Sequence, residues 1–399
     1  MYTPTAGGGH ARYAWELLNA LSEQQRGYRF ELVSSEDLDP QFHPVNYRLH
    51  AILPALKDRR DFPNRAAWVA SRLTHYARRD LQFLKWLKSR PDVVAVHFQE
   101  WTPWQAAPLF RRIRAMGKKI FYTNHNVVPH KYPKFIPKQI VDGWTRRACL
   151  QADGLFVLSD LLADQLSRFL GDDHPPIRVV PHGVWTVADM EKAPGLDERL
   201  GWKRLLSFGT LRKNKGVDLL LRAAEYLPGY SITIAGEPIH SDYFHDEILP
   251  LVRQLRARGV KVDLIDHFVP DEQVGALFAS HSAIVLPYTR DFVAQSGVAF
   301  MALAYQLPVV ASEAGGLRDL FDEFKIGVTF RDPTPQALAQ AVKELYSQDA
   351  RRDLVRQIAA ARDRYSWHQA ARATMAGYAL EEEKVRHAED CPIAATATP

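Results

Sequence analysis

Two successive series of short apolar runs separated by amphipathic stretches constrain the fold of this chain more than any other feature. In the first half, β-branched runs predict strands at 30–33, 93–97, 119–123, 154–158 and 177–181. The second half restarts the series, with strands predicted at 204–208, 231–235, 262–265, 283–287 and 308–312. Helical patterns lie between the runs in both halves, and this alternation is typical of parallel α/β units.

The two series predict an α/β protein of two doubly wound, Rossmann-like parallel-sheet domains. A length of 399 residues also favours two domains over a single core. We place the domain boundaries at 1–187 for the N-terminal domain, 188–203 for a polar linker, 204–364 for the C-terminal domain, 365–385 for a final helix and 386–399 for a disordered tail. Because open α/β sheets bind ligands at the carboxyl ends of their strands, the two domains are expected to face a cleft.

The start of the chain lacks the apolar strand that usually leads into the glycine loop of a doubly wound domain. Gly7, Gly8 and Gly9 follow only the residues MYTPTA. Since that opening strand is commonly central in the sheet, its loss would leave the neighbouring strands with unpaired edges. We therefore expect the first strand to be missing and the native protein to begin further upstream. Mass spectrometry that finds Met1 at the native terminus would contradict this expectation.

Composition and cysteine content limit the class of protein. A hydrophobic content of 46% and a charged content of 24% are those of an ordinary soluble globular protein. Cys149 and Cys391 are far apart and lack the spacing of a zinc site or a disulfide framework, which favours a reducing cytosol. The sequence contains neither a signal-peptide pattern nor a window near the ~20 apolar residues of a membrane span. We expect a cytoplasmic protein, peripheral on the inner face of the membrane at most.

Positive charge is concentrated in the first domain. Residues 51–150 hold about twenty Lys and Arg against about six Asp and Glu, although the net charge of the whole chain is only +5. Such a basic face is either a solvated surface or an attraction for an anionic membrane or an anionic lipid-linked substrate. Segment 57–90 also carries Trp68 and Trp86 at helical spacings. Core aromatics beneath a solvated face, an interfacial helix and a nucleic-acid stripe are all open interpretations.

A basic elbow lies at 207–222, where the sequence reads SFGTLRKNKGVDLLLR. A buried strand ends there, Gly209 permits a turn, and a helix is predicted from Val217. Arg212, Lys213 and Lys215 stand between the strand and the helix. A helix N-terminus favours an anion, and an Arg fork with a Lys point charge suits a diphosphate. The elbow is not a Walker loop, because the GxxxxGK[ST] pattern is absent, and a solvated basic turn is the alternative.

A second anion-binding segment is predicted after the strand at 283–287. Gln295, Ser296 and Gly297 open the apolar helix VAFMALAY, so that a hydroxyl and a glycine stand at a helix N-terminus. Exposed amides at such a place can receive phosphate oxygens. The next strand, PVVAS, ends in Gly315 and Gly316, where backbone can approach a ligand closely.

Taken together, these segments resemble the GT-B retaining glycosyltransferases known as glycosyl transferases group 1. The resemblance runs from GGGHARYAWELLNAL to SWHQAARATMAGY and includes TNHNVVPH at 123–130, RVVPHGV at 178–184 and the basic elbow. The segment LPYTRDFVAQSGVAFMALAYQLPVVASEAGGL is similar to the donor-binding part of a QSG-containing branch. The resemblance as a whole implies the GT-B architecture, with the final helix crossing back to the first domain.

The resemblance implies a role for each matching position. Arg212 and Lys215 would hold the diphosphate of a nucleotide-sugar and stabilise the leaving nucleotide, and His125 would contact the donor sugar near the reacting carbon. The remaining donor-binding positions that it implies are Gly8, Gly9, Gly209, Gln295, Ser296, Gly297 and Val298. Expected partners are a nucleotide-sugar donor, a glycan or lipid-linked acceptor and an anionic membrane surface, with no nucleic acid. No cofactor and no metal are implied.

The chain departs from the common family pattern at two glutamates. Val293 and Met301 stand where an E-x7-E pair is usual, although the QSG-containing branch often lacks that pair too, and Thr210 replaces a frequent Arg. No paired carboxylates suited to a double-displacement reaction are evident, since Glu100 and Glu237 near strand ends have no evident partner. A front-face transfer, in which the acceptor hydroxyl attacks the same face that the nucleotide leaves, therefore fits the sequence better than a double displacement.

The predicted function is thus transfer of a hexose from a nucleotide-sugar to a hydroxyl of a glycan or lipid-linked acceptor, in surface polysaccharide synthesis. Two other functions stay open. One is a pseudo-enzyme that binds nucleotide without turnover, which the missing glutamates would allow. The other is a protein that binds a membrane or nucleic acid through its basic face.

Overall fold

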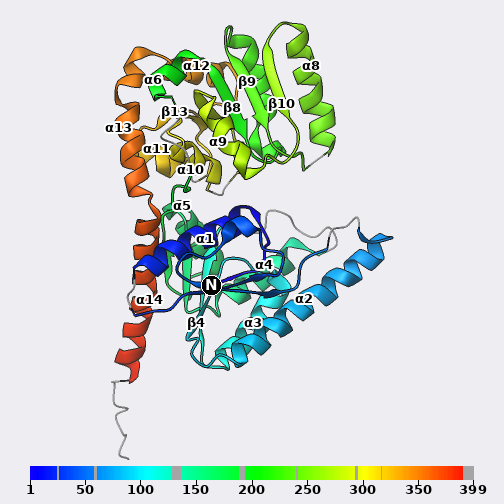
Figure 1. The fold of residues 1–399 in the computed structure, drawn as a ribbon, viewed down its shortest axis with the longest axis vertical. Coiled ribbons are helices and arrows are strands. Elements are labelled where there is room, and N and C mark those ends of the chain that lie inside the picture. The colour runs from blue at the N-terminus through cyan, green and yellow to red at the C-terminus, as the bar shows by residue number, and fades with distance from the viewer. Residues whose placement is uncertain are drawn as a thin grey trace, which may run out of the picture. The chain divides into compact units, whose positions relative to one another are not determined.

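The chain divides into two compact α/β units, which are drawn in Figure 1. The computed structural model describes residues 1–399 except 25–26, 58–60, 128–135, 188–193, 240, 293–294, 316 and 390–399. The first unit contains Met1–Pro181 together with Trp367–Pro399, and the second contains His182–Ser366. Each unit has one sheet in which every recorded strand pair is parallel. The prediction of two doubly wound domains is therefore confirmed.

The first domain has a seven-stranded sheet in the order β3-β2-β1-β4-β5-β6-β7. Its strands are β1 (Tyr2–Thr3), β2 (Glu31–Ser35), β3 (Arg48–Leu53), β4 (Ala95–Phe98), β5 (Lys119–Asn124), β6 (Gly154–Val157) and β7 (Ile177–Val179). Its helices are α1 (Gly8–Glu23), α2 (Arg65–Lys88), α3 (Pro103–Arg114), α4 (Lys138–Cys149), α5 (Asp160–Leu170) and α14 (Trp367–Glu389), with the 3-10 turn η1 (Pro40–Phe42). The order reverses between β1 and β4, so the loops after these strands meet at one edge.

A short strand lies at the start of the chain, where the sequence analysis located none. Strand β1 is only two residues long, yet it lies in the centre of the sheet. It pairs with Val33 and Ser34 of β2 on one side and with Phe98 of β4 on the other. The side chain of Tyr2 is buried against Phe83 and Phe98, at ring-centroid distances of 4.7 and 4.9 Å. This packing explains why so short a segment forms a strand.

The second domain has a six-stranded sheet in the order β10-β9-β8-β11-β12-β13. Its strands are β8 (Arg204–Phe208), β9 (Ser231–Ala235), β10 (Lys261–Ile265), β11 (Ala283–Leu286), β12 (Val309–Ser312) and β13 (Gly327–Phe330). Its helices are α6 (Leu196–Gly201), α7 (Val217–Ala223), α8 (Leu249–Ala257), α9 (Asp271–Ala279), α10 (Gly297–Ala304), α11 (Leu317–Glu323), α12 (Pro335–Leu345) and α13 (Gln348–Arg364), with the 3-10 turns η4 (Lys213–Lys215) and η5 (Ala224–Tyr226) and the π-helix η6 (Tyr243–Ile248).

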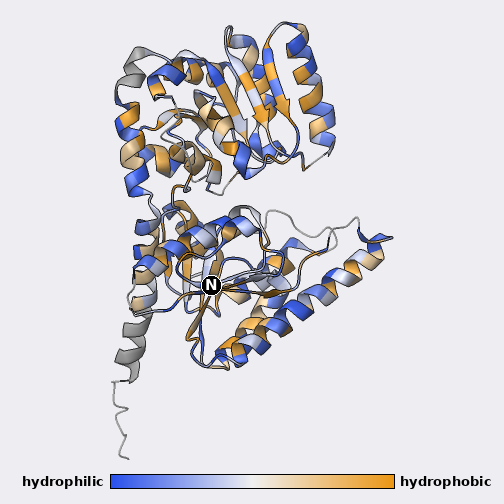
Figure 2. Cartoon of the chain, in the orientation of Figure 1, coloured by the Kyte–Doolittle hydropathy of each residue, from blue (hydrophilic) through white to orange (hydrophobic). Residues whose placement is uncertain are grey.

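Continuous apolar runs form the central strands of the second domain. All four residues of β11 and all four of β12 are buried, as expected for parallel strands covered on both faces. In Figure 2 the hydrophobic colour is concentrated on the strands and on the helix sides near them. The strand order reverses between β8 and β11, which puts the segments that follow these two strands at the topological switch point of the sheet.

The predicted domain boundaries can be compared with the observed elements. Within the predicted linker 188–203, residues 188–193 lie outside the described part, and α6 occupies 196–201. The guanidinium of Arg199 on α6 donates to the carbonyls of Tyr305 and Gln306 at 3.0 and 3.1 Å, which fixes α6 in the second domain. Helix α14 packs on α1 of the first domain, where Trp367 lies edge-on to Tyr13 at 5.2 Å. It runs to Glu389, four residues into the predicted tail, and residues 390–399 lie outside the described part. None of the described helices is both long and apolar enough to cross a bilayer.

Candidate functional site

The basic elbow forms the connection from β8 to α7 in the second domain. Gly209, which follows β8, has φ +103°, and Gly216, which precedes α7, has φ +61°. Both conformations favour glycine. At Gly216 a Cβ atom would lie 1.9 Å from the carbonyl oxygen of Pro287, so a side chain cannot be placed there without moving the backbone after β11. The two glycines thus let the elbow turn tightly against a neighbouring loop.

That neighbouring loop connects β11 to α10, and it contacts the elbow at several points. The N–H of Thr289 donates to the carbonyl of Asn214 at 3.1 Å. On the other side, a Cβ at Gly209 would lie 3.4 Å from the side chain of Val298. The structure therefore brings together the two segments that the sequence predicted separately as anion-binding.

Lys215 is the central cation of the elbow. Its ammonium lies 3.8 Å from the ring centroid of Tyr288 and 4.3 Å from that of Phe292, within the range of cation–π attraction. Burial of the ammonium, together with the smaller effect of the positive charge of Arg212, lowers the pKa of Lys215 to about 7. Sequence reasoning missed both rings, because nothing in the segment PYTRDF indicates that they contact Lys215.

The other two cations of the elbow differ in their surroundings. The Nε of Arg212 donates to the hydroxyl of Thr210 at 3.1 Å, and the side chain is half-buried. Lys213 is exposed, and its ammonium lies 3.5 Å from a carboxylate oxygen of Glu247. Among the described residues, neither Arg212 nor Lys215 has a carboxylate within ion-pair distance. The elbow therefore presents two neighbouring positive groups whose charge is not compensated by the described chain.

The start of α10 lies beside this pair of cations. Ser296 is buried at the N-cap position, and its hydroxyl is 2.8 Å from the hydroxyl of Tyr288, the ring that contacts Lys215. Gly297 is held by Trp185, whose indole Nε1 donates to the Gly297 carbonyl at 2.9 Å. No side chain caps the first turn. Gln295 is half-buried just before Ser296, whereas Val293, one of the two departures noted in the sequence, lies outside the described residues.

In the first domain, the glycines that follow β1 leave open space at the start of α1. Gly8 has φ +77°, and a Cβ at Gly7, Gly8 or Gly9 would meet nothing within 4 Å. The N-cap residue is Gly7, which has no side chain to cap the first turn of the helix. Backbone of this turn is therefore accessible to close approach by a ligand.

His125 follows β5 at the same edge of the first sheet and is half-buried. Its ring stacks on that of His10 at 4.6 Å, and Tyr13 lies edge-on to it at 4.8 Å. The Nε2 atom of His125 is 3.1 Å from Oε1 of Gln99. The amide nitrogen of Gln99 donates to the Thr123 hydroxyl at 3.4 Å. Because the Gln99 oxygen must then accept, we assign the proton of His125 to Nε2.

Glu100, which the sequence left without a partner, has two. One of its carboxylate oxygens accepts a hydrogen bond from the Thr5 hydroxyl, and the other lies 3.6 Å from Nδ1 of His10. Although burial opposes it, the interactions with His10 and Thr5 hold the pKa of the Glu100 carboxyl below its usual value. Thr5, His10 and Glu100 meet only through the fold, because they follow the adjacent strands β1 and β4. Glu237, by contrast, is exposed, although its backbone carbonyl accepts from Leu211.

These arrangements indicate what each domain can do chemically. The switch point of the second domain offers two cations and an uncapped helix start to one anionic group, which suits a diphosphate. The matching edge of the first domain offers open glycine backbone, a half-buried histidine and an ionised carboxylate, which suit hydroxyl groups of a sugar. Two doubly wound domains with these features define the GT-B class of proteins.

Comparison with known proteins agrees with this class. The first domain matches the model of Glycosyltransferase Family 4 over residues 7–186, and the second matches that of Glycosyl transferases group 1 over residues 191–364. Glycogen synthase from Mycobacterium tuberculosis is 26% identical, with 94% of this chain and 92% of that protein covered. GDP-mannose:glycolipid 4-beta-D-mannosyltransferase from Xanthomonas campestris is 25% identical over 75% of this chain and 78% of the relative.

Among solved structures, sucrose-phosphate synthase from Thermosynechococcus elongatus has the same fold, with a TM-score of 0.70, 17% identity and coverage of 95% of this chain and 94% of that one. The two domain matches, the relatives and the fold lead to one conclusion. The chain is a glycosyltransferase of the GT-B fold.

Proposed function

We propose that this glycosyltransferase is a retaining hexosyltransferase of the QSG-containing branch, which moves a sugar from a nucleotide-sugar to a hydroxyl of a glycan or lipid-linked acceptor in surface polysaccharide synthesis. The observation that carries the proposal is the ammonium of Lys215, which lies against Tyr288 and Phe292 beside Arg212 and has no carboxylate of the described residues to compensate it. Such a site is incomplete without an anion, and the diphosphate of the donor supplies one.

In this proposal Arg212 and Lys215 act on the leaving group. As the bond between the anomeric carbon and the diphosphate oxygen breaks, negative charge grows on that oxygen, and both cations stabilise it. The acceptor hydroxyl forms the new bond on the same face, and its proton passes to the leaving diphosphate oxygen. Backbone groups of Gly209, Ser296, Gly297 and Val298, together with Gln295, would position the diphosphate and the sugar.

The first-domain residues would act on the donor sugar. His125 is proposed to contact a sugar hydroxyl near the reacting carbon, and its stacking on His10 and hydrogen bond to Gln99 would fix the ring for that contact. Gly8 and Gly9 would approach the donor through their backbone, since no side chain stands in the way. The relatives support a nucleotide-sugar donor and a glycan or glycolipid acceptor, because one is named as a glycogen synthase and another as a GDP-mannose-dependent glycolipid mannosyltransferase.

Binding of a nucleoside diphosphate is expected to take up protons. The pKa of Lys215 is about 7 in the free protein, and a bound diphosphate favours the ammonium, so the pKa rises in the complex. A raised pKa in the bound state means that the complex holds more protons above pH 7 and that affinity falls as the pH rises. Isothermal titration calorimetry at pH 8, in buffers of different ionisation enthalpy, measures this uptake.

The control for this experiment is Lys215→Arg, because arginine stays charged and leaves no proton to be taken up at pH 8. The ligand is whichever of UDP, GDP, ADP and dTDP binds most tightly. Proton uptake by the wild type that is lost in the arginine variant supports the assignment. No uptake by the wild type, or equal uptake by both proteins, would contradict it.

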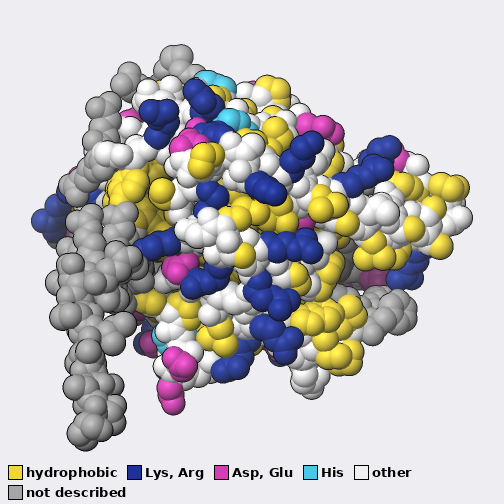
Figure 3. Space-filling view, turned by 90° about the horizontal axis from the view of Figure 1, so that it is seen from below, with side chains coloured by type: hydrophobic (Ala, Val, Ile, Leu, Met, Phe, Trp, Pro, Cys, Tyr) yellow, Lys and Arg dark blue, Asp and Glu magenta, His cyan; other side chains and the backbone are white. Residues whose placement is uncertain are grey.

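We also propose that the first domain attaches to anionic membrane surfaces through α2. The guanidinium of Arg72 lies 5.3 Å from the ring of Trp68, and the neighbouring apolar side chains of Val69 and Leu73 are exposed. The face shown in Figure 3 carries many Lys and Arg side chains with hydrophobic ones between them. Cations beside exposed apolar groups are the pattern of an interfacial helix. The other tryptophan of α2, Trp86, is not part of this exposed group, because its ring packs on that of Phe83.

Flotation with vesicles tests this attachment. At low salt the protein is expected to float with phosphatidylglycerol vesicles and not with phosphatidylcholine vesicles, because the attraction is mainly electrostatic. The double variant Arg65→Glu/Arg72→Glu should stay at the bottom of the gradient. Arg356→Glu, which changes an exposed cation on α13 of the second domain, should float like the wild type. Equal flotation of both variants would contradict a role for α2.

A further inference from the structure

A groove of about 430 Å³ lies on the first domain between the neighbouring helices α3 and α4. Its volume is within the range of sites that bind small ligands. The side chains that characterise it are two tryptophans, two arginines and two small residues, namely Trp104, Ala107, Pro108, Arg111, Trp144 and Arg147. We call it the α3–α4 groove. None of the residues proposed to act on the donor lines it.

Helical spacing on α3 gives the groove its length. Trp104, Ala107 and Arg111 recur at intervals of three and four residues, so they lie along one face of the helix. Ala107 and its neighbour Pro108 are small, and they leave room between the large side chains of Trp104 and Arg111. Seven residues of helix span about 10 Å, which is long enough for a short saccharide.

The two tryptophans give the groove aromatic surface that other side chains hold in place. Trp104 is 37% exposed, and Trp144 is half-buried. Tyr76 of α2 lies edge-on to Trp104 at 5.9 Å, and the guanidinium groups of Arg72 and Arg79 lie 5.6 and 5.1 Å from the Tyr76 ring. The C–H groups of a sugar carry a small positive charge and stack on the negative face of an aromatic ring. A ring already held in position loses little conformational freedom when such a ligand binds.

The two arginines of the groove differ from their neighbours on the same helices. Arg114 of α3 donates to the carboxylate of Asp153 at 2.9 Å, and Arg146 of α4 donates to the last carbonyl of α5 at 2.7 Å. Arg111 and Arg147 are exposed, and among the described residues neither has a carboxylate within ion-pair distance. Two guanidinium groups in one groove without a compensating charge favour an anionic group of a ligand.

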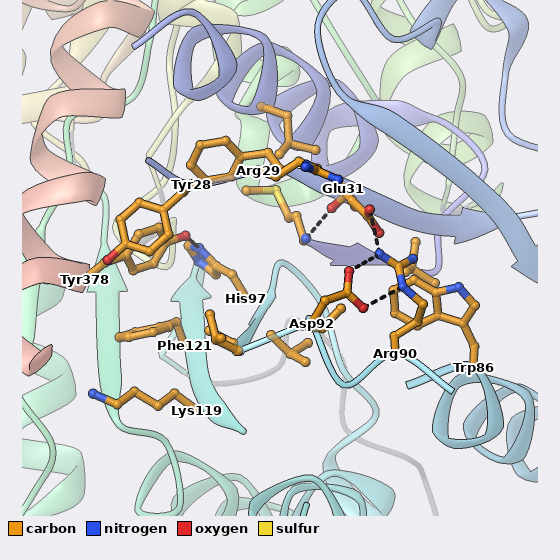
Figure 4. Close-up of a pocket in the computed structure, with 18 of the residues that line it drawn as sticks. Tyr28, Arg29, Glu31, Trp86, Arg90, Asp92, His97, Lys119, Phe121 and Tyr378 are labelled. Carbon is orange, nitrogen blue, oxygen red and sulfur yellow. Dashed lines mark hydrogen bonds and ion pairs between the residues drawn. The ribbon is translucent and has the colours of Figure 1, made fainter. Parts of the chain in front are cut away.

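A larger cavity of the first domain, drawn in Figure 4, lacks this feature. It has a volume of about 660 Å³, and Arg90 at one end of it is already paired with the carboxylates of Glu31 and Asp92. Its arginine is therefore satisfied by the protein itself. The α3–α4 groove, by contrast, combines aromatic rings with cations that the described chain leaves available.

We propose that the α3–α4 groove is a binding site for an acidic saccharide, one that carries a carboxylate or a phosphate. Trp104 and Trp144 stack on its sugar rings, and Arg111 and Arg147 pair with its acidic group. For its role the inference rests on the proposed transfer to a glycan: a chain bound in the groove stays at a high effective concentration near the enzyme between transfers. The binding itself needs no nucleotide-sugar.

Isothermal titration calorimetry of the full chain, without a donor, tests the proposal. The acidic probes are tetragalacturonate and a hyaluronan tetrasaccharide, and the neutral probe is maltotetraose, a chain of the same length. At least one acidic probe is expected to bind more tightly than maltotetraose by about tenfold or more, because hydrogen bonds between charged groups are about twice as strong as neutral ones. The affinity should fall as salt is added.

Two variants and a matched control assign this binding to the groove. Arg111→Gln/Arg147→Gln changes only exposed side chains, so the fold should be kept, and the affinity for the acidic probe should fall by about tenfold or more. Trp104→Ala should weaken binding of the same probe by about tenfold, through loss of stacking. Arg112→Gln/Arg168→Gln removes the same charge from exposed positions outside the groove and should bind like the wild type.

Three results would overturn the proposal. The first is that neither acidic probe binds, or that maltotetraose binds equally well. The second is an equal loss of affinity in the groove variant and in the control. The third is a wild type that binds no saccharide but floats with phosphatidylglycerol vesicles in a way that Arg111→Gln/Arg147→Gln abolishes, because the groove would then hold a lipid headgroup. Nucleoside diphosphate binding depends on the elbow of the second domain, so a failure here and a failure of the proposed donor site are separate results.

Discussion

Replacing Lys215 with alanine is expected to lower the turnover number of the enzyme by about 10²- to 10³-fold, the usual loss when one group that stabilises developing charge is removed. The ammonium lies against Tyr288 and Phe292, which hold it in place before the donor binds. Alanine removes the charge at the position where the leaving diphosphate becomes more negative. The measurement is the rate of nucleoside diphosphate release from the nucleotide-sugar that the protein binds.

Lys213→Ala is the matched control for this variant. Lys213 lies two residues away on the same 3-10 turn, but its side chain is exposed and paired with Glu247. Its loss should change the turnover number by less than about twofold, since exposed ion pairs contribute little. Equal losses in the two variants would mean that the elbow acts only through its general positive charge. Nucleotide binding by the wild type without turnover of any donor would instead make the protein a pseudo-enzyme.

Gly216→Ala is expected to destabilise the second domain by about 2 to 5 kcal/mol, from left-handed backbone strain and overpacking together. The new Cβ would lie 1.9 Å from the Pro287 carbonyl oxygen at a φ of +61°, so the elbow and the β11–α10 loop must separate. The melting temperature should fall by roughly 10 °C. Nucleoside diphosphate affinity should fall with it, because the two segments hold the same anion.

Gly229→Ala separates the two causes of this destabilisation. Gly229 also has a positive φ, of +81°, but a Cβ there meets nothing within 4 Å. That variant should lose only the strain contribution, about 1 to 2 kcal/mol, and keep its nucleotide affinity. If both variants lose the same stability and bind nucleotide equally, the close approach of the elbow to Pro287 has no functional role.

The strands most completely predicted from the sequence are those with continuous apolar runs. Residues 204–208 and 231–235 coincide with β8 and β9, since burial on both faces leaves no alternative to a central strand. Strand β3 was missed because its residues are mostly half-exposed, and its sequence RLHAIL gives no clear period. Strand β1 was missed because two residues carry no periodic signal, and only the pairing with β2 and β4 defines them.

The candidate site was predictable only in part. Arg212 and Lys215 stood out because cations and glycines cluster between a strand and a helix. Tyr288 and Phe292 could not be assigned to Lys215, because strand order and not sequence distance brings the β11–α10 loop to the elbow. His10 and Glu100 come together for the same reason, across the adjacent strands β1 and β4.

The central claim is that the elbow binds the diphosphate of a nucleotide-sugar, and a thermal-shift panel tests it most directly. UDP, GDP, ADP, dTDP and their common sugars are each added to the wild type, Lys215→Ala and Lys213→Ala. Ligand that binds only the folded state raises the melting temperature. We predict a rise for one nucleotide base that is lost in Lys215→Ala and kept in Lys213→Ala. No rise with any nucleotide, or the same rise in Lys215→Ala as in the wild type, would contradict the claim.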